Sequence, residues 1–143
     1  MIRRTGARVT RPRVAVLAAL LAAEHALTHH EVGERVDRGL GIDRVTIYRV
    51  LDWLDQQGLA HKIAGDDRVW RYNAAEHAHA RAHAHFHCNR CGTVICLDEW
   101  EAAPQVGLPP GYLAHHVELT VKGICAGCVS HARARAAPGA ARR

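Results

Sequence analysis

Four cysteines form two Cys-x-x-Cys pairs that stand about 35 residues apart along the chain. The first pair is Cys88 and Cys91, and the second is Cys125 and Cys128. Four thiolates are the number that a tetrahedral structural zinc site takes, and a spacing of two residues lets one tight turn direct both sulfurs at one ion. The pattern therefore predicts a structural zinc site formed by all four cysteines.

Two disulfides or a redox pair are the alternative interpretations of the same cysteines. Disulfides form in oxidising compartments, and residues 1–4 are followed by no apolar stretch of the kind that a secretory leader contains. A fifth cysteine, Cys96, would also remain unpaired. These observations favour zinc, and they predict a cytoplasmic location.

Histidines are the second unusual feature of the composition. Twelve occur in 143 residues, and five of them fall in one 11-residue window, which suggests metal binding rather than core packing. Within this window His83 and His85 are two residues apart. Side chains at that spacing on a strand point to the same side, so both imidazoles can share one ion.

The charge distribution favours an anionic partner. The formal net charge is +5, and arginines gather at both ends of the chain. No apolar run approaches the roughly 18 residues that a membrane span requires. At 143 residues the chain allows one or two small units, each with a limited core, so a metal would contribute usefully to stability.

No catalytic motif accompanies the candidate metal ligands. A zinc hydrolase would show His-Glu-x-x-His, and a zinc deaminase would pair His-x-Glu with Pro-Cys-x-x-Cys. Neither pattern occurs in the sequence. An enzyme, and with it a small-molecule substrate, is therefore not expected.

The first half of the chain predicts three helices followed by a hairpin, which is the order of a winged helix. Residues 1–9 are interpreted as a basic arm, and Thr10 can cap a first helix. Thr28 and Glu31 form a capping box for a second helix, and Asp43 can cap a third that runs to about Gln57. The apolar positions expected to face the core on the first helix are Val14, Leu17, Leu20 and Leu21.

After the third helix the spacing of the apolar residues changes from helical to alternating. Two alternating segments flank the turn residues 65–67, which predicts a two-stranded hairpin. The hairpin would be the wing, and its expected contacts to DNA phosphates are Lys62, Arg68 and Arg71.

The third helix is the candidate reading element for DNA. Its buried stripe follows helical spacing through Ile47, Val50, Leu51 and Leu54. Its opposite face can enter a major groove by its N-terminal residues, where arginine pairs with guanine. An ordinary solvated helix face is the alternative. The expected DNA contacts are Arg44, Thr46, Tyr48 and Arg49, together with Arg13 of the N-terminal basic cluster.

Four motifs in order give the sequence a resemblance to a known family. They are Val9-Thr10-Arg11-Pro12-Arg13, Thr46-Ile47-Tyr48-Arg49-Val50-Leu51, His83-x-His85-x-x-Cys88-x-x-Cys91-Gly92 and Cys125-x-x-Cys128. In this order and spacing the chain resembles the ferric uptake regulator (Fur) superfamily from about residue 6 to residue 130. The resemblance implies a homodimeric, metal-sensing repressor of α+β class that binds double-stranded operator DNA. It also implies that Tyr48 and Arg49 contact the operator.

The resemblance implies four regions. They are a winged-helix DNA-binding domain at residues 1–73, a hinge at 74–82, a small α/β dimerisation and metal-binding domain at 83–133, and a basic tail without a core pattern at 134–143. In the dimerisation domain, strands are expected at 84–88, 93–97 and 116–121, with a short helix at 98–105.

The resemblance also implies a regulatory metal site at the hinge, separate from the four cysteines. Its expected ligands are His61, His83, His85 and Cys96, where position 96 carries glutamate in many relatives. A shell of three imidazoles and one thiolate suits zinc better than iron. The run before Lys62 also resembles the zinc-responsive (Zur) branch, although Asn73 stands where several members of that branch have a ligating cysteine.

Other functions remain open at this level. The regulatory metal could be iron(II), as in the iron-responsive branch, or the protein could be a peroxide sensor of the same superfamily. Cys96 could be a buried core thiol, and His61 a surface strand residue. A constitutive zinc-ribbon module is a further alternative, but it leaves the histidine cluster unexplained.

Overall fold

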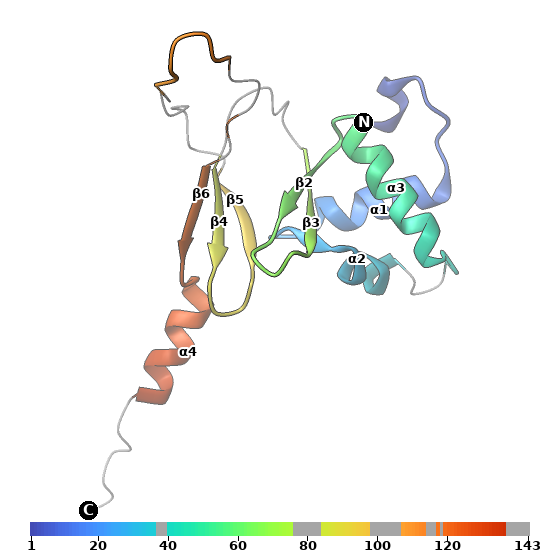
Figure 1. Ribbon diagram of the computed structural model, residues 1–143. Helices are drawn as coiled ribbons and strands as arrows, with labels where there is room; N and C mark the ends of the chain where they lie inside the picture. The colour runs from blue at the N-terminus through green and yellow to red at the C-terminus, as the bar shows by residue number, and fades with distance from the viewer. Residues whose placement is uncertain (37–39, 76–83, 98–106, 114–116, 118, 137–143) are drawn as a thin grey trace, which may run out of the picture.

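The computed structural model describes residues 1–36, 40–75, 84–97, 107–113, 117 and 119–136. It has the α+β architecture that the sequence predicts, and its described strands form two three-stranded sheets. Figure 1 shows the helices α1–α3 beside the first sheet, and the second sheet on the other side of it. Among the described helices, none combines the length and the apolarity that a bilayer crossing requires.

The first sheet is antiparallel, with the strand order β1-β3-β2. Strands β2 (Ala60–Ala64) and β3 (Trp70–Ala74) form the expected hairpin, in which His61 lies opposite Asn73. Strand β1 (Leu27–Thr28) pairs with β3 and was not predicted. A strand of two residues is too short to show an alternating apolar pattern, so it could not be predicted from the sequence.

Helices α1 (Arg11–Leu21), α2 (His29–Val36) and α3 (Arg44–Gln56) pack with this sheet around the main core. The expected buried stripe of α3 is confirmed, because all four of its apolar residues lie in that core. For α1 the prediction was partly wrong. Val14 and Leu21 are exposed, and Val16 is fully buried in their place.

The N-terminal arm also differs from the prediction. Residues Ile2–Thr5 form a short 3-10 helix, η1, and Ile2 is buried in the main core. A single apolar residue among arginines carries no periodic signal, so only packing against the helices reveals its role. The start of the chain therefore belongs to the folded domain.

Local hydrogen bonds explain where α2 and α3 begin. Thr28 and Glu31 form the predicted capping box, in which the Glu31 carboxylate accepts from the Thr28 amide at 2.7 Å and the Thr28 hydroxyl accepts from the Glu31 amide at 3.2 Å. Asp43 caps α3 by accepting from the amide of Thr46 at 2.9 Å. The Asp43 cap therefore fixes the start of the helix whose N-terminal residues are expected to contact DNA.

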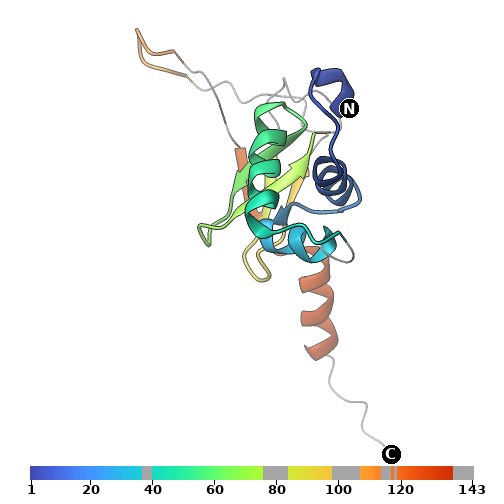
Figure 2. The same ribbon diagram turned by 90° about the vertical axis from the view of Figure 1, so that its right-hand side faces the viewer.

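The second sheet has the order β5-β4-β6, with β4 (Ala84–Cys88) in the centre. Strand β5 (Val94–Leu97) runs antiparallel to β4, and β6 (Leu119–Gly123) runs parallel to it. Helix α4 (Ala126–Ala136) follows β6 and projects away from the rest of the molecule in both views (Figures 1 and 2). Residues 134–136 therefore belong to a helix, where the sequence predicted the start of a tail.

The two sheets are joined by direct contacts. The amide of Ala26 donates to the carbonyl of Val94 at 2.8 Å, and both residues pack with Ile63 in a second small core. At the tip of the β2–β3 hairpin, Asp66 forms an ion pair with Lys122 of β6 at 2.8 Å. The hinge was predicted at 74–82, but Ala74 ends β3 and the amide of Ala75 donates to the carbonyl of Leu59 at 3.0 Å. Residues 76–82, His83 and the helix expected at 98–105 lie outside the described residues.

Candidate functional site

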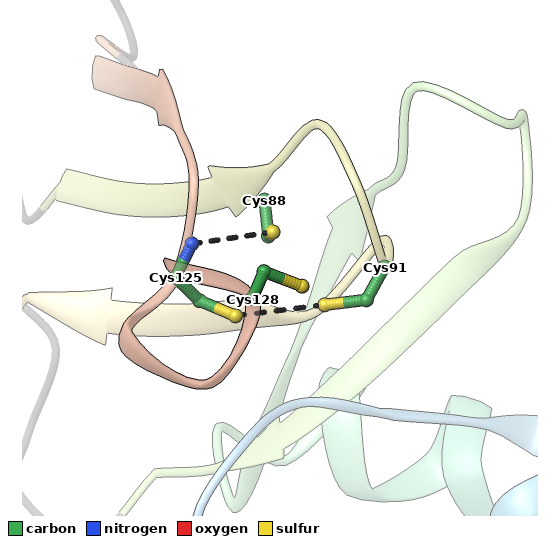
Figure 3. A group of neighbouring side chains, drawn as sticks. All are labelled: Cys88, Cys91, Cys125 and Cys128. Atoms are coloured by element: carbon green, nitrogen blue, oxygen red, sulfur yellow. Dashed lines mark hydrogen bonds between the residues drawn. The ribbon is translucent and has the colours of Figure 1, made fainter. Parts of the chain in front are cut away.

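The four cysteines of the two Cys-x-x-Cys pairs converge on one point. Cys88 ends β4, Cys91 lies in the turn that follows, and the other two flank the start of α4 (Figure 3). Their sulfurs all lie within 4.8 Å of one another. Gly92, with a φ of 72°, lets the chain turn back directly after Cys91. Only the fold brings together two pairs whose nearer cysteines are 34 residues apart.

Hydrogen bonds at this four-cysteine cluster favour thiolates at its first pair. Donation from the amides of Cys125 and Cys91 lowers the pKa of Cys88 to about 6. The side chain of Thr93 lowers the pKa of Cys91, whose sulfur lies 3.1 Å from the hydroxyl. In contrast, burial and the neighbouring cysteines raise the pKa of Cys128 to about 12.

Four thiolates within 4.8 Å of one another repel, and a bound cation would compensate this charge. All five cysteines of the chain lie in described parts of the structure, and none of them forms a disulfide. Four converging sulfurs match the tetrahedral zinc shell in number and in chemistry. The donor set therefore fits zinc.

A second cluster contains His61 of β2, His85 of β4 and Cys96 of β5. Their ligand atoms also lie within 4.8 Å of one another. Nε2 of His61 is 3.1 Å from the sulfur of Cys96 and 3.4 Å from Nε2 of His85. Three of the four predicted regulatory ligands are thus brought together, and the fourth, His83, lies outside the described residues.

Strand pairing and sheet docking explain how this second cluster forms. His85 and Cys96 are directly opposite each other in the antiparallel β4–β5 pair, so their side chains share one face. His61 comes from the other sheet, which the contacts of Ala26 and Ile63 with Val94 hold against β5. The cluster therefore spans both halves of the molecule.

The face of α3 that is predicted to read DNA is accessible at its N-terminal end. Arg44, Tyr48 and Arg49 are exposed, and Thr46 is half-buried. The hydroxyl of Thr46 donates to the capping carboxylate of Asp43 at 2.7 Å, so this residue also holds the helix start.

His29 supports this face in a way that the sequence did not indicate. Its ring stacks on that of Tyr48, with centroids 3.6 Å apart and planes 9° apart. Burial lowers the pKa of His29, and the positive charge of Arg44 and the neighbouring His30 lower it further. The stack fixes one side of the Tyr48 ring and leaves the tyrosine 46% exposed.

Two arginines that were expected to contact DNA are bound to other residues of the protein. The guanidinium of Arg13 lies 3.8 Å from the ring centroid of Trp53 and also donates to the carbonyl of Arg8 at 2.7 Å. Arg71 is only 8% exposed and binds Asp67 through both terminal nitrogens, at 2.9 and 2.8 Å. The prediction that Arg71 contacts phosphate is therefore wrong, because a hairpin turn that contains Asp67 supplies its partner.

The structure joins a winged helix to a second sheet. The four-cysteine cluster lies at that sheet, and the cluster of His61, His85 and Cys96 lies between the two sheets. These features define the class of a metal-binding, DNA-binding regulator. Residues 4–105 match the sequence model of the ferric uptake regulator family, so the chain belongs to that family.

Known relatives support the same assignment. The chain is 33% identical over 135 residues to the transcriptional regulator FurA of Mycobacterium tuberculosis, and the match covers 89% of this chain and 86% of FurA. A zinc uptake regulator complexed with zinc and DNA superposes with a TM-score of 0.66 at 25% identity, covering 92% of this chain and 89% of that one. The ferric uptake regulator of Vibrio cholerae has the same fold, with a TM-score of 0.62 at 24% identity and coverage of 87% and 96%. The protein is a transcriptional regulator of this family.

Proposed function

We propose that the protein is a zinc-dependent repressor that binds operator DNA as a homodimer and controls metal-uptake genes in the cytoplasm. The observation that carries the proposal is the cluster of His61, His85 and Cys96, because its members come from both sheets. A ligand held there links the DNA-binding half to the other half. Neither catalytic residues nor a small-molecule substrate are part of the proposal.

The donor set supports zinc as the regulatory metal. One thiolate and two imidazoles are soft to borderline ligands, and His83 would complete a four-coordinate shell. Non-haem iron(II) is typically bound by two histidines and one carboxylate, and the side chains of the described cluster include no carboxylate. These side chains together would hold the zinc ion, which would link the elements that carry them.

Occupancy of this cluster would select one orientation of the winged helix. His61 lies on β2, directly after α3 in the chain, so fixing its imidazole against β4 and β5 restricts the sheet that carries the reading helix. A ligand favours the conformation in which its donors converge. In a dimer, the same restriction in both copies would set the spacing between two reading helices.

The four-cysteine cluster has a different role in the proposal. Its four cysteines come from the end of β4, the turn after it and the start of α4, so a zinc ion there would stabilise the second sheet without contacting the first. It would be held permanently, whereas the cluster between the sheets would fill and empty. The assigned DNA contacts are Arg44, Thr46, Tyr48 and Arg49, with Arg13 near the N-terminus.

The proposal is tested by titrating DNA binding with metal. Protein that retains one zinc per monomer is used to select DNA from a random-sequence pool at high free zinc. Binding to the selected DNA is then measured at buffered free concentrations of zinc and, anaerobically, of iron(II). The matched variant is Cys96→Ser, which removes one regulatory ligand and leaves the four-cysteine cluster intact.

Tight binding that appears with a second zinc per monomer, and that Cys96→Ser shifts to higher free zinc, is the expected result. Activation by iron(II) at lower free concentrations than zinc would instead assign the protein to iron sensing. Metal-independent binding to the selected DNA would remove the regulatory role of the cluster altogether.

A further inference from the structure

Asn73 of β3 lies at the regulatory cluster, although it supplies none of the predicted metal ligands. Its side-chain Nδ2 donates a hydrogen bond to the sulfur of Cys96 at 3.1 Å. Asn73 lies opposite His61 in the β2–β3 hairpin, and Cys96 lies opposite His85 in the β4–β5 pair. The cluster is therefore built from two cross-strand pairs that face each other, and Asn73 occupies the fourth corner.

The orientation of the Asn73 amide is fixed by the backbone. Its Oδ1 accepts from the amide of Ala74 at 3.0 Å, which directs Nδ2 rather than the oxygen at the Cys96 sulfur. A carbonyl oxygen in that position would face the sulfur lone pairs without a proton between them. The Ala74 amide therefore makes Asn73 a donor to the sulfur and holds its oxygen at the backbone of β3.

We propose that Asn73 is a positioning residue for the regulatory metal site, which sets the direction and the charge of the Cys96 thiolate by an N–H···S hydrogen bond. This inference rests on the proposed function, because it assigns a role in the same cluster. A hydrogen bond to a thiolate draws charge from the sulfur and restricts the rotation of the side chain. Outer partners of this kind orient the metal ligands and tune their donor strength.

The charge of the site supports the same role. Cys96 is the only anionic ligand among the clustered side chains that the structure describes. A second thiolate at position 73 would make the site doubly anionic, whereas a neutral amide leaves the thiolate as the sole negative charge. Asn73 thus keeps the donor set soft and weakly charged, which disfavours hard cations that need several anionic oxygens.

The test uses cobalt(II) as a coloured probe in protein whose four-cysteine cluster retains zinc. Cobalt bound at the regulatory cluster should show a thiolate-to-cobalt charge-transfer band that disappears in Cys96→Ser. The variant Asn73→Leu keeps the size of the side chain and removes the donor. Without the hydrogen bond the sulfur lone pair rises in energy, so the band should move to lower energy.

The same variant should weaken the binding of cobalt and of zinc, measured by competition with a chelator. The expected loss is about 10- to 100-fold, the usual effect of removing an outer partner of a metal ligand. Far-UV circular dichroism of the protein without the regulatory metal should be unchanged, because the β2–β3 hairpin keeps its backbone pairing.

Three other results would overturn the inference. An unchanged band with unchanged affinity in Asn73→Leu would mean that the hydrogen bond has no effect on the metal, while the proposed function would stand. Weaker binding with an unmoved band would mean that Asn73 acts only through the shape of the hairpin. If the parent protein has no band that depends on Cys96, both the inference and the proposed regulatory site fail.

Discussion

The replacement Cys125→Ser should destabilise the second sheet while leaving the main core of the winged helix folded. Cys125 stands just before α4, and its amide donates to the sulfur of Cys88 across the cluster at 3.3 Å. Serine removes one thiolate of four, and a structural zinc site is closed only when all four ligands are present. The variant should therefore lose the structural zinc.

The magnitude follows from the loop that the zinc closes. The sulfurs of Cys91 and Cys125 lie 3.7 Å apart and belong to residues separated by 34 positions. If the zinc acts as a cross-link, the chain-entropy relation for a loop of that length gives about 4 kcal/mol at 25 °C. A small domain has a total stability of about 5–15 kcal/mol, so the loss is a large part of it.

The assay combines zinc content with local stability. Elemental analysis should find one structural zinc per monomer in the parent protein and less in Cys125→Ser. Native-state hydrogen exchange should show lost protection in β4 and β6, and retained protection in α1 and α3, which have their own core. The matched control is Cys96→Ser, which changes a cysteine of similar burial outside the four-cysteine cluster.

Two outcomes would refute this reasoning. If Cys125→Ser keeps its zinc and the protection of β6, the four cysteines do not form one closed site. If Cys96→Ser loses as much protection as Cys125→Ser, the separation into a structural and a regulatory cluster is wrong.

Three further predictions concern the DNA-binding half. Arg49→Ala should weaken binding to the selected operator by ~1–3 kcal/mol, the usual value of a bidentate base contact, in a gel-shift or anisotropy titration; an equal loss on random DNA would mean that Arg49 touches only phosphate. Thr28→Ala should lower the free energy of unfolding by ~0.5–2 kcal/mol through loss of the α2 cap, as measured in urea, and an unchanged value would show that the capping box is unimportant. Asp67→Asn should lower stability by at most ~1 kcal/mol at pH 7, because Asp67 is half-exposed. The Arg71 hydrogen bonds hold the folded pKa of Asp67 well below its ordinary value. This stabilisation is therefore present above the unfolded pKa of about 4 and is lost as the pH falls through the folded pKa. The free energies of unfolding of the parent and the variant should converge in strong acid. A difference between them that stays constant down to pH 2 would contradict the assignment.

Local patterns in the sequence determined much of this protein. The capping box at Thr28, the cap at Asp43 and the apolar stripe of α3 involve residues within a few positions of one another, so their geometry follows from helix periodicity alone. The two Cys-x-x-Cys pairs likewise have a spacing that suits one ion. These features were predictable because each depends on short-range geometry.

The tertiary structure decided the features that depend on distant residues. Strand β1 and the buried Ile2 became visible only through packing, since neither carries a repeating pattern. The burial of Arg71 depends on a turn that supplies Asp67, and the stack of His29 on Tyr48 joins two different helices. A pattern of residue types does not show which side chains meet across elements.

The regulatory cluster shows both contributions. The sequence supplied the residue types, and through a family resemblance it indicated His61, His85 and Cys96 as partners. Only the docking of two sheets places His61 beside a cysteine 35 residues later, and only the paired strands place Asn73 against the same sulfur. The physical reason is that a metal site needs donors within a few ångströms, a distance set by sheet register and packing rather than by separation along the chain.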